Sequence, residues 1–178
     1  MEVSVSERLS SLRKLFASQD TDGLKEFAHV CAEDALALND QQIAEFSIVA
    51  FALAKLFDKP HIVHSSRWKK FSQQLTQRLT QGEKCTGNTC SGIIDNILTD
   101  IDELSSDLGG FVVSVVEKAR LKTASQLYSH GASIGIAVEL TSADRRELLS
   151  YLGAMTLADK FESKKVSQRI ALADKLFT

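Results

Sequence analysis

The side chains in this chain that are best suited to chemistry are cationic. Arg145 and Arg146 fall in the first turn of a predicted helix, where two positive charges oppose the helix dipole at about 0.3–1 kcal/mol each. An anionic partner such as duplex DNA would offset that cost, because recognition helices contact base edges with their N-terminal residues. Ion pairs with Glu139 or Glu147 on a solvated face are the alternative. The candidate nucleic-acid contacts in this quarter of the chain are Arg145, Arg146, Lys164, Lys165 and Arg169.

A second basic patch surrounds the single tryptophan. Arg67, Lys70 and Arg78 share one stripe of a predicted helix, interleaved with Trp68 and Phe71. Basic and aromatic side chains together are typical of nucleic-acid surfaces. The aromatic pair also fits an adjacent apolar stripe that faces a core, so a solvated basic face beside buried aromatic rings is the competing interpretation.

Two cysteines and two histidines are the only other conspicuous group. Cys85 and Cys90 are separated by four residues, and His61 and His64 lie about 20 residues upstream. All four are zinc-ligand types, but a helix separates the pairs and the spacing is not that of a common zinc finger, so we expect no metal site. A Cys85–Cys90 disulfide stays open beside two free thiols. Phosphate-cradling Gly-rich loops, nucleophile elbows and paired-His zinc motifs are missing from the sequence, which implies no cofactor and gives no positive sign of an enzyme.

Composition limits the fold class. The chain has 178 residues, of which 44% are hydrophobic and 25% charged, with nine Gly and one Pro. So few turn residues argue against an all-β chain, and the apolar content argues against disorder. The polar, acidic N-terminus is unlike a secretory signal, and no apolar run approaches the roughly 20 residues of a membrane span. We therefore expect a cytoplasmic protein without a membrane segment.

The net charge of −2 conceals an alternation along the chain. Residues 1–58 carry 5 basic and 10 acidic residues, and residues 83–116 carry 1 and 6. Residues 59–82 carry 5 basic residues and no acid, and residues 117–178 carry 10 basic and 7 acidic residues. Packed helices with complementary charge explain this pattern, and a basic face for an anionic partner is the alternative.

Apolar residues recur at helical spacing almost throughout. Residues 41–57 are apolar on nearly all sides, which predicts the central helix of a core. Ser6 is expected to cap the first helix, and Pro60 to begin a helix that runs to Leu79. Residues 111–116 have strand composition, but the helical pattern of the following residues favours a helix. The C-terminal quarter predicts short helices near 133–140, 145–152 and 164–177.

Residues 127–152 have the local pattern of a helix-turn-helix. A small residue, Ala137, lies where two crossing helices would meet, and Asp144 with Glu147 forms a capping-box-like arrangement at the start of the second helix. The apolar positions spaced to form a miniature core are Ile134, Leu140, Leu148 and Leu152.

This segment resembles the helix-turn-helix of small prokaryotic antitoxin-type proteins encoded beside PIN-domain nucleases. The matching residues are Leu127-Tyr128, Gly131, Ser133-Ile134-Gly135, Ala137, Glu139-Leu140 and Glu147-Leu148-Leu149. The segment is also similar to the C-terminal part of uncharacterised archaeal helical proteins of about this length. Three positions depart from the pattern: Ser142 replaces a turn Gly and would be strained in a left-handed conformation, Ile136 replaces a basic residue, and Asp144 replaces a hydroxyl cap.

The sequence therefore predicts an all-α protein, in which a helical bundle over residues 1–108 precedes a long helix and a helix-turn-helix-like unit over residues 109–178. The leading functional hypothesis is a non-enzymatic nucleic-acid-binding or regulatory protein that binds duplex DNA through the C-terminal cations. Such a motif usually binds DNA as a homodimer, and the sequence leaves the oligomeric state open. The alternative is a helical protein-interaction or assembly module in which the helix-turn-helix-like element is only structural.

Overall fold

The computed structural model of this chain describes residues 3–83, 91–106 and 114–162. Across these ranges the protein is all helical and contains no strand, which confirms the all-α prediction. No helix in the described ranges is long and apolar enough to cross a bilayer. The helices are α1 (Val5–Ala17), α2 (Thr21–Leu38), α3 (Gln41–Phe57), α4 (Pro60–Val63), α5 (Ser66–Gly82), α6 (Ser91–Ser106), α7 (Val115–Ser129), α8 (Ile134–Thr141) and α9 (Arg145–Glu162).

Helix α3 is the centre of the core, as its apolar pattern predicts. Asn39 takes a left-handed conformation that ends α2, and the Asp40 carboxylate accepts hydrogen bonds from the backbone N–H groups of Gln42 and Ile43, which begins α3. Its buried residues are Ile43, Ala44, Phe46, Ser47, Ile48, Val49, Ala50, Phe51, Ala52, Leu53, Ala54 and Leu56. A helix that is apolar all round has to be covered on every side.

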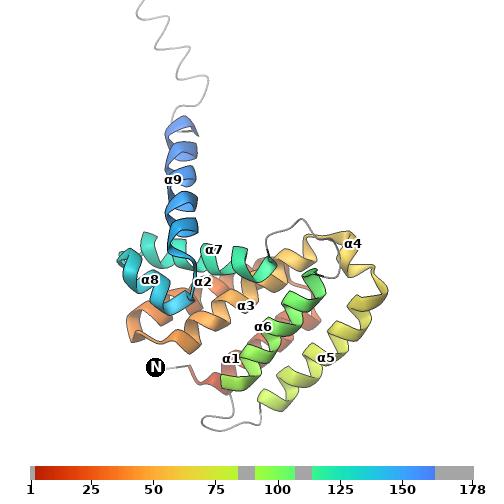
Figure 1. Cartoon of the computed structure of the whole chain (residues 1–178). Coiled ribbons are helices and arrows are strands. Elements are labelled where there is room, and N and C mark those ends of the chain that lie inside the picture. The colour runs from red at the N-terminus through yellow and green to blue at the C-terminus, as the bar shows by residue number, and fades with distance from the viewer. Residues whose placement is uncertain (1–2, 84–90, 107–113, 163–178) are drawn as a thin grey trace, which may run out of the picture.

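The other helices supply that cover (Figure 1). Helices α2, α7 and α8 pack on α3 towards one end of the molecule, while α1, α4 and α6 pack on it elsewhere. Helix α5 packs on α1 and α6 and contributes Trp68, Phe71, Leu75 and Leu79 to the core, the stripe expected from the sequence. Helix α9 packs on α7 and then extends away from the body of the bundle (Figure 1).

Three helix boundaries differ from the sequence-based expectation. Ser4, not Ser6, caps α1, because its hydroxyl pairs reciprocally with the N–H and side chain of Glu7. The Ser6 hydroxyl instead donates to the carbonyl oxygen of Glu83. The helix that begins at Pro60 stops at Val63, and the Ser65 hydroxyl starts a new one by accepting from the N–H of Trp68.

The third difference is the length of α9, which continues to Glu162 rather than ending near residue 152. Several expectations lie outside the described residues and stay predictions. These are the helix near 164–177, the conformation of residues 111–113, and the state of Cys85 and Cys90. From Val115 onward the segment following residues 111–113 is helical, as expected, and the Ser114 hydroxyl caps it.

One buried cation ties the first two helices together. The side chain of Arg8 is 3% exposed, and its guanidinium donates to Asp34 at 2.6 Å and to the Cys31 sulfur at 3.3 Å. Burial raises the pKa of the Cys31 thiol to about 11, although the nearby Arg8 charge opposes the shift. The thiol is therefore neutral at physiological pH and acts as a packing residue.

The Arg8–Asp34 pair provides a test of the fold. Breaking a buried ion pair from one side costs about 3–5 kcal/mol, and partial exposure of the Asp34 side chain lowers our expectation to about 2–3 kcal/mol. We expect Asp34→Ala to lower the free energy of unfolding by that amount in urea denaturation. Glu33→Ala, an exposed neighbour on α2, is the matched control and should change it by less than about 0.5 kcal/mol. Equal losses in the two variants would contradict the role assigned to Arg8.

Candidate interaction surfaces

Helices α8 and α9 are joined by a three-residue turn. The Ser133 hydroxyl caps α8 by accepting from the N–H of Ile136, and Gly131 before it has φ +99°, which favours glycine. Ser142 ends α8 with φ 52° and ψ 29°, the left-handed conformation that the sequence identified as strained for a non-glycine residue. Leu140 and Leu148, two of the four miniature-core positions expected from the pattern, are buried, and Ile134 and Leu152 are partly buried against the core. The small residue at the predicted helix crossing, Ala137, is also buried.

Both helices of this unit are attached to α7. Arg120 on α7 donates to the carbonyl oxygen of Thr141 at 2.7 Å, which satisfies a backbone acceptor at the C-terminus of α8. Its Nε also lies 3.7 Å from the Glu117 carboxylate. Helix α8 packs on α7 and α3, and α9 packs on α7. The orientation of α9 is therefore determined mainly by its contact with α7.

Arg145 and Arg146 are exposed in the first turn of α9. The Asp144 carboxylate caps this turn, accepting from the N–H groups of Arg146 and Glu147 at 2.9 Å each. Within the part of the chain that the structure describes, neither arginine forms the ion pair with Glu139 or Glu147 that was the alternative interpretation. Lys164, Lys165 and Arg169 lie outside the described residues.

The surface around these arginines is not uniformly basic. Ile136 on α8 and Leu149 on α9 are both exposed and apolar. Glu139, Asp144 and Glu147 are exposed acids on the same two helices and the turn between them. This mixture of apolar groups and both charges is more typical of a protein-binding surface than of a phosphate-binding one.

The apolar stripe of α9 passes from the core into solvent. Leu148, Leu152 and Met155 follow at helical spacing on one side of the helix. Leu148 is 0% exposed, Leu152 is partly buried against the core, and Met155 is 40% exposed. The stripe thus continues along α9 beyond the point where the bundle covers it.

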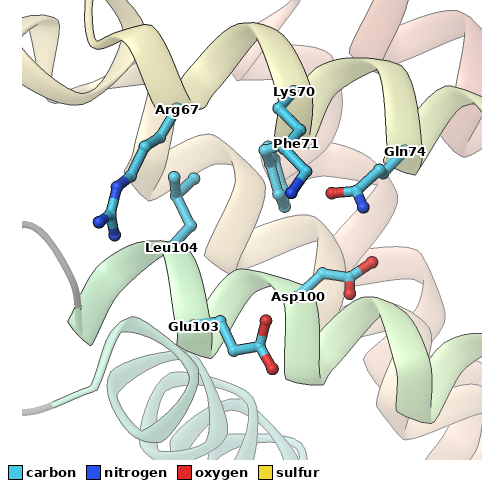
Figure 2. A pocket seen from close by; sticks show the side chains of 7 residues that line it. All are labelled: Arg67, Lys70, Phe71, Gln74, Asp100, Glu103 and Leu104. Atoms are coloured by element: carbon cyan, nitrogen blue, oxygen red, sulfur yellow. The ribbon is translucent and has the colours of Figure 1, made fainter.

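The second basic patch faces an acidic helix (Figure 2). Arg67 and Lys70 lie on the α5 side of a cavity of about 400 Å³, and Asp100 and Glu103 lie on its α6 side. Arg78 contacts both carboxylate oxygens of Asp100, with Nε 2.6 Å from Oδ2 and Nη2 3.1 Å from Oδ1. Part of the charge alternation seen in the sequence is therefore complementarity between packed helices.

A second groove was not anticipated from the sequence. It lies between α2, α3, α7 and α9, encloses about 760 Å³, and has a mainly apolar floor that includes Phe51, Val115 and Ala119. We call it the lysine groove, because four lysines from three helices line it: Lys25, Lys55, Lys118 and Lys122. The one signal in the sequence is the i, i+4 spacing of Lys118 and Lys122, which puts both on one face of α7.

In the described part of the chain, the histidines belong to no metal-binding cluster. His64 hydrogen-bonds through Nδ1 to the carbonyl oxygen of Pro60 at 2.7 Å, closing the short helix α4. Within the described ranges, His, Cys, Asp and Glu side chains form no group of three or more that could hold a metal ion. Cys85 and Cys90 are outside those ranges.

Glu45 is a half-buried carboxyl on α3. Burial raises its pKa to about 7, and the negative charge of Asp95 on α6 adds to the shift, while Arg120 on α7 opposes it. The folded protein therefore retains a proton that an unfolded carboxyl near its usual pKa of 4.5 would release. The free energy of unfolding consequently falls as pH rises from about 4.5 to about 7.

Comparison of the chain with family models, with curated proteins and with solved structures finds no match. The resemblance of residues 127–152 to an antitoxin-type helix-turn-helix stays a prediction.

Glu45→Gln should remove the fall in the free energy of unfolding that the buried Glu45 carboxyl causes between about pH 4.5 and about pH 7. At pH 8 the variant is expected to be about 1–3 kcal/mol more stable than the parent, because the amide carries no charge to desolvate. At pH 4, where both forms are neutral, the two should be equal. Urea unfolding at pH 4, 6 and 8 measures this, with Glu26→Gln on the exposed face of α2 as control. Parallel pH profiles for the parent and Glu45→Gln would contradict the shift.

Proposed function

We propose that this chain is an all-helical assembly module that pairs with a second copy of itself through α9. The observation that carries the proposal is the apolar stripe of α9, which is buried at Leu148 and exposed at Met155. Helix α9 has 18 residues, about 27 Å, and it leaves the bundle after packing on α7 (Figure 1). A helix without tertiary contacts is marginal in water, so a partner that covers this stripe would stabilise it.

The charges along α9 suit an antiparallel partner. Its first turn holds Arg145, Arg146 and Glu147, and the sequence of its last turn holds Asp159, Lys160 and Glu162, so the start carries a net charge of +1 and the end −1. Both net charges oppose the helix dipole of a lone helix. A two-fold axis across α9 would place the basic start of one copy beside the acidic end of the other, and would do so twice. In this proposal the helix-turn-helix-like unit of α8 and α9 is a packing element that holds the pairing helix on α7.

A second candidate function, binding of duplex DNA, is favoured by a different observation. Arg145 and Arg146 are exposed at the start of a helix that follows a tight turn, and neither forms an ion pair among the described residues. Here α8 and α9 would serve as a helix-turn-helix reader, with α9 as the recognition helix. The exposed acids and apolar side chains beside the arginines make this the weaker candidate.

Self-association can be tested by sedimentation equilibrium of the full chain. We expect a dimer, and we expect Met155→Asp to weaken dimerisation at least tenfold, because each dimer loses two buried methionines and gains two buried charges. Val30→Asp, a matched exposed apolar residue on α2, should leave the dimer intact. If the parent chain stays monomeric at about 100 µM, its free energy of dimerisation is weaker than about 5.5 kcal/mol. That result would overturn the proposal.

Charge reversal tests the antiparallel geometry. Arg145→Glu/Arg146→Glu and Asp159→Lys/Glu162→Lys should each weaken the homodimer, since each juxtaposes like charges. An equimolar mixture of the two variants should form a heterodimer in which both ends are complementary again. Two variants that stay monomeric in the mixture, although each is folded by circular dichroism, would contradict an antiparallel pair.

DNA binding is tested by fluorescence anisotropy with a labelled duplex at 50 to 200 mM salt. If the second candidate is right, affinity falls steeply with salt, and Arg145→Ala/Arg146→Ala lowers the slope of log K against log salt by about 2. Lys14→Ala/Lys69→Ala removes two exposed lysines elsewhere and is the control. No binding at 50 mM salt, or binding unaffected by the arginine variant, excludes this function for α9.

A further inference from the structure

The geometry of the lysine groove points to a binding site for a small anionic amphiphile, with a long-chain carboxylate as the ligand class. The inference does not depend on the dimer or DNA proposals, because neither proposal uses the lysines of this groove. It depends on three properties of the groove: its size, its apolar floor and its unpaired positive rim.

The groove has the size and lining of a ligand site. Its volume of about 760 Å³ falls within the roughly 300–1,000 Å³ typical of small-molecule pockets. Phe51 and Ala54 on α3 and Val115 and Ala119 on α7 supply apolar surface, and Ala154 on α9 also lines the groove. An aliphatic chain laid along this floor would remove apolar surface from water on both sides.

The rim carries positive charge that the described protein does not neutralise. Lys55, Lys118 and Lys122 form no ion pair among the residues that the structure describes, whereas Lys25 lies 3.4 Å from Asp22. Two acids, Asp58 and Glu147, also line the groove, so the four lysines leave it net positive.

A fifth lysine, Lys59, lies close enough to feel these positive charges. Burial lowers the pKa of Lys59, and the positive charges of Lys118 and Lys55 lower it further. Lys118 and Lys122 are one turn apart on the same face of α7, so a single carboxylate can contact both ammonium groups. A ligand anion between these lysines would relieve the repulsion.

The positive charge and the apolar lining of the groove also indicate which kind of ligand fits it. The chain's own residues 163–178 carry four basic residues and one acid, so their charge matches that of the rim and disfavours them. A neutral apolar ligand would leave the lysines unpaired. A carboxylate with an aliphatic tail would pair with the lysines through its head group and cover the apolar floor with its tail.

Isothermal titration of the full chain with dodecanoate, below its micellar concentration, tests the proposal. We expect one ligand per chain, with affinity rising about twofold to fourfold for each methylene from octanoate to dodecanoate as more of the tail is buried. Acetate, which has the head group alone, and dodecanol, which has the tail alone, should each bind at least tenfold more weakly. Equal affinity for dodecanoate and dodecanol, or no dependence on chain length, would overturn the proposal.

Variants locate the site. Lys118→Gln/Lys122→Gln should weaken dodecanoate binding about tenfold, while Lys14→Gln/Lys69→Gln, which removes two exposed lysines outside the groove, should not. Ala154→Trp should block the groove without touching the rim, and thermal unfolding checks that it remains folded. Binding that survives both Lys118→Gln/Lys122→Gln and Ala154→Trp would place the ligand elsewhere and contradict the inference. Tighter binding of an acidic amphipathic peptide than of dodecanoate, at the same residues, would identify a macromolecular occupant instead and would also overturn it.

Discussion

The complete burial of α3 is the constraint on which the rest of the structure depends. A helix that exposes apolar groups on all sides cannot lie at a surface, so other helices must surround it. Helices α2, α7 and α8 meet this need towards one end of the molecule, and α1, α4 and α6 meet it elsewhere. Two hydroxyls in the interior, those of Ser47 on α3 and Thr123 on α7, lie 3.1 Å apart and hydrogen-bond to each other, because an unpaired buried hydroxyl would be costly.

The position of α7 links this core to every candidate surface at the C-terminal end. One side of α7 packs on α3, and Arg120 beside it ties down the end of α8. Lys118 and Lys122 line the lysine groove, whose other wall is α9. Because α9 packs on α7 before it leaves the bundle, the same contact creates the groove and presents the exposed part of α9 for pairing. Packing and binding therefore use neighbouring residues of one helix.

Elements governed by local interactions were predictable. The bounds of α3 were predicted from its apolar run, and the cap at Asp144 and the helix start at Pro60 were predicted from residue type and position. The helix boundaries that were predicted wrongly include one where two neighbouring residues could each act as the cap. Ser4 and Ser6 can both cap a helix N-terminus. The Ser6 hydroxyl instead donates to the carbonyl oxygen of Glu83, a residue distant in the sequence, and a local sequence pattern does not predict that contact. The extension of α9 past residue 152 was not predicted from the sequence.

The sequence by itself determined that the chain is helical, which of its residues form the central helix, and that Arg145 and Arg146 begin a C-terminal helix, since periodicity and capping act within a few residues. Only the tertiary structure decided which charges are used internally and which are left over. Arg78 is neutralised by Asp100, 22 positions away, whereas Lys55, Lys118 and Lys122 line one apolar groove from two helices and form no ion pair among the described residues. Electrostatic and apolar complementarity of this kind depends on distances in space, which spacing along a chain does not encode.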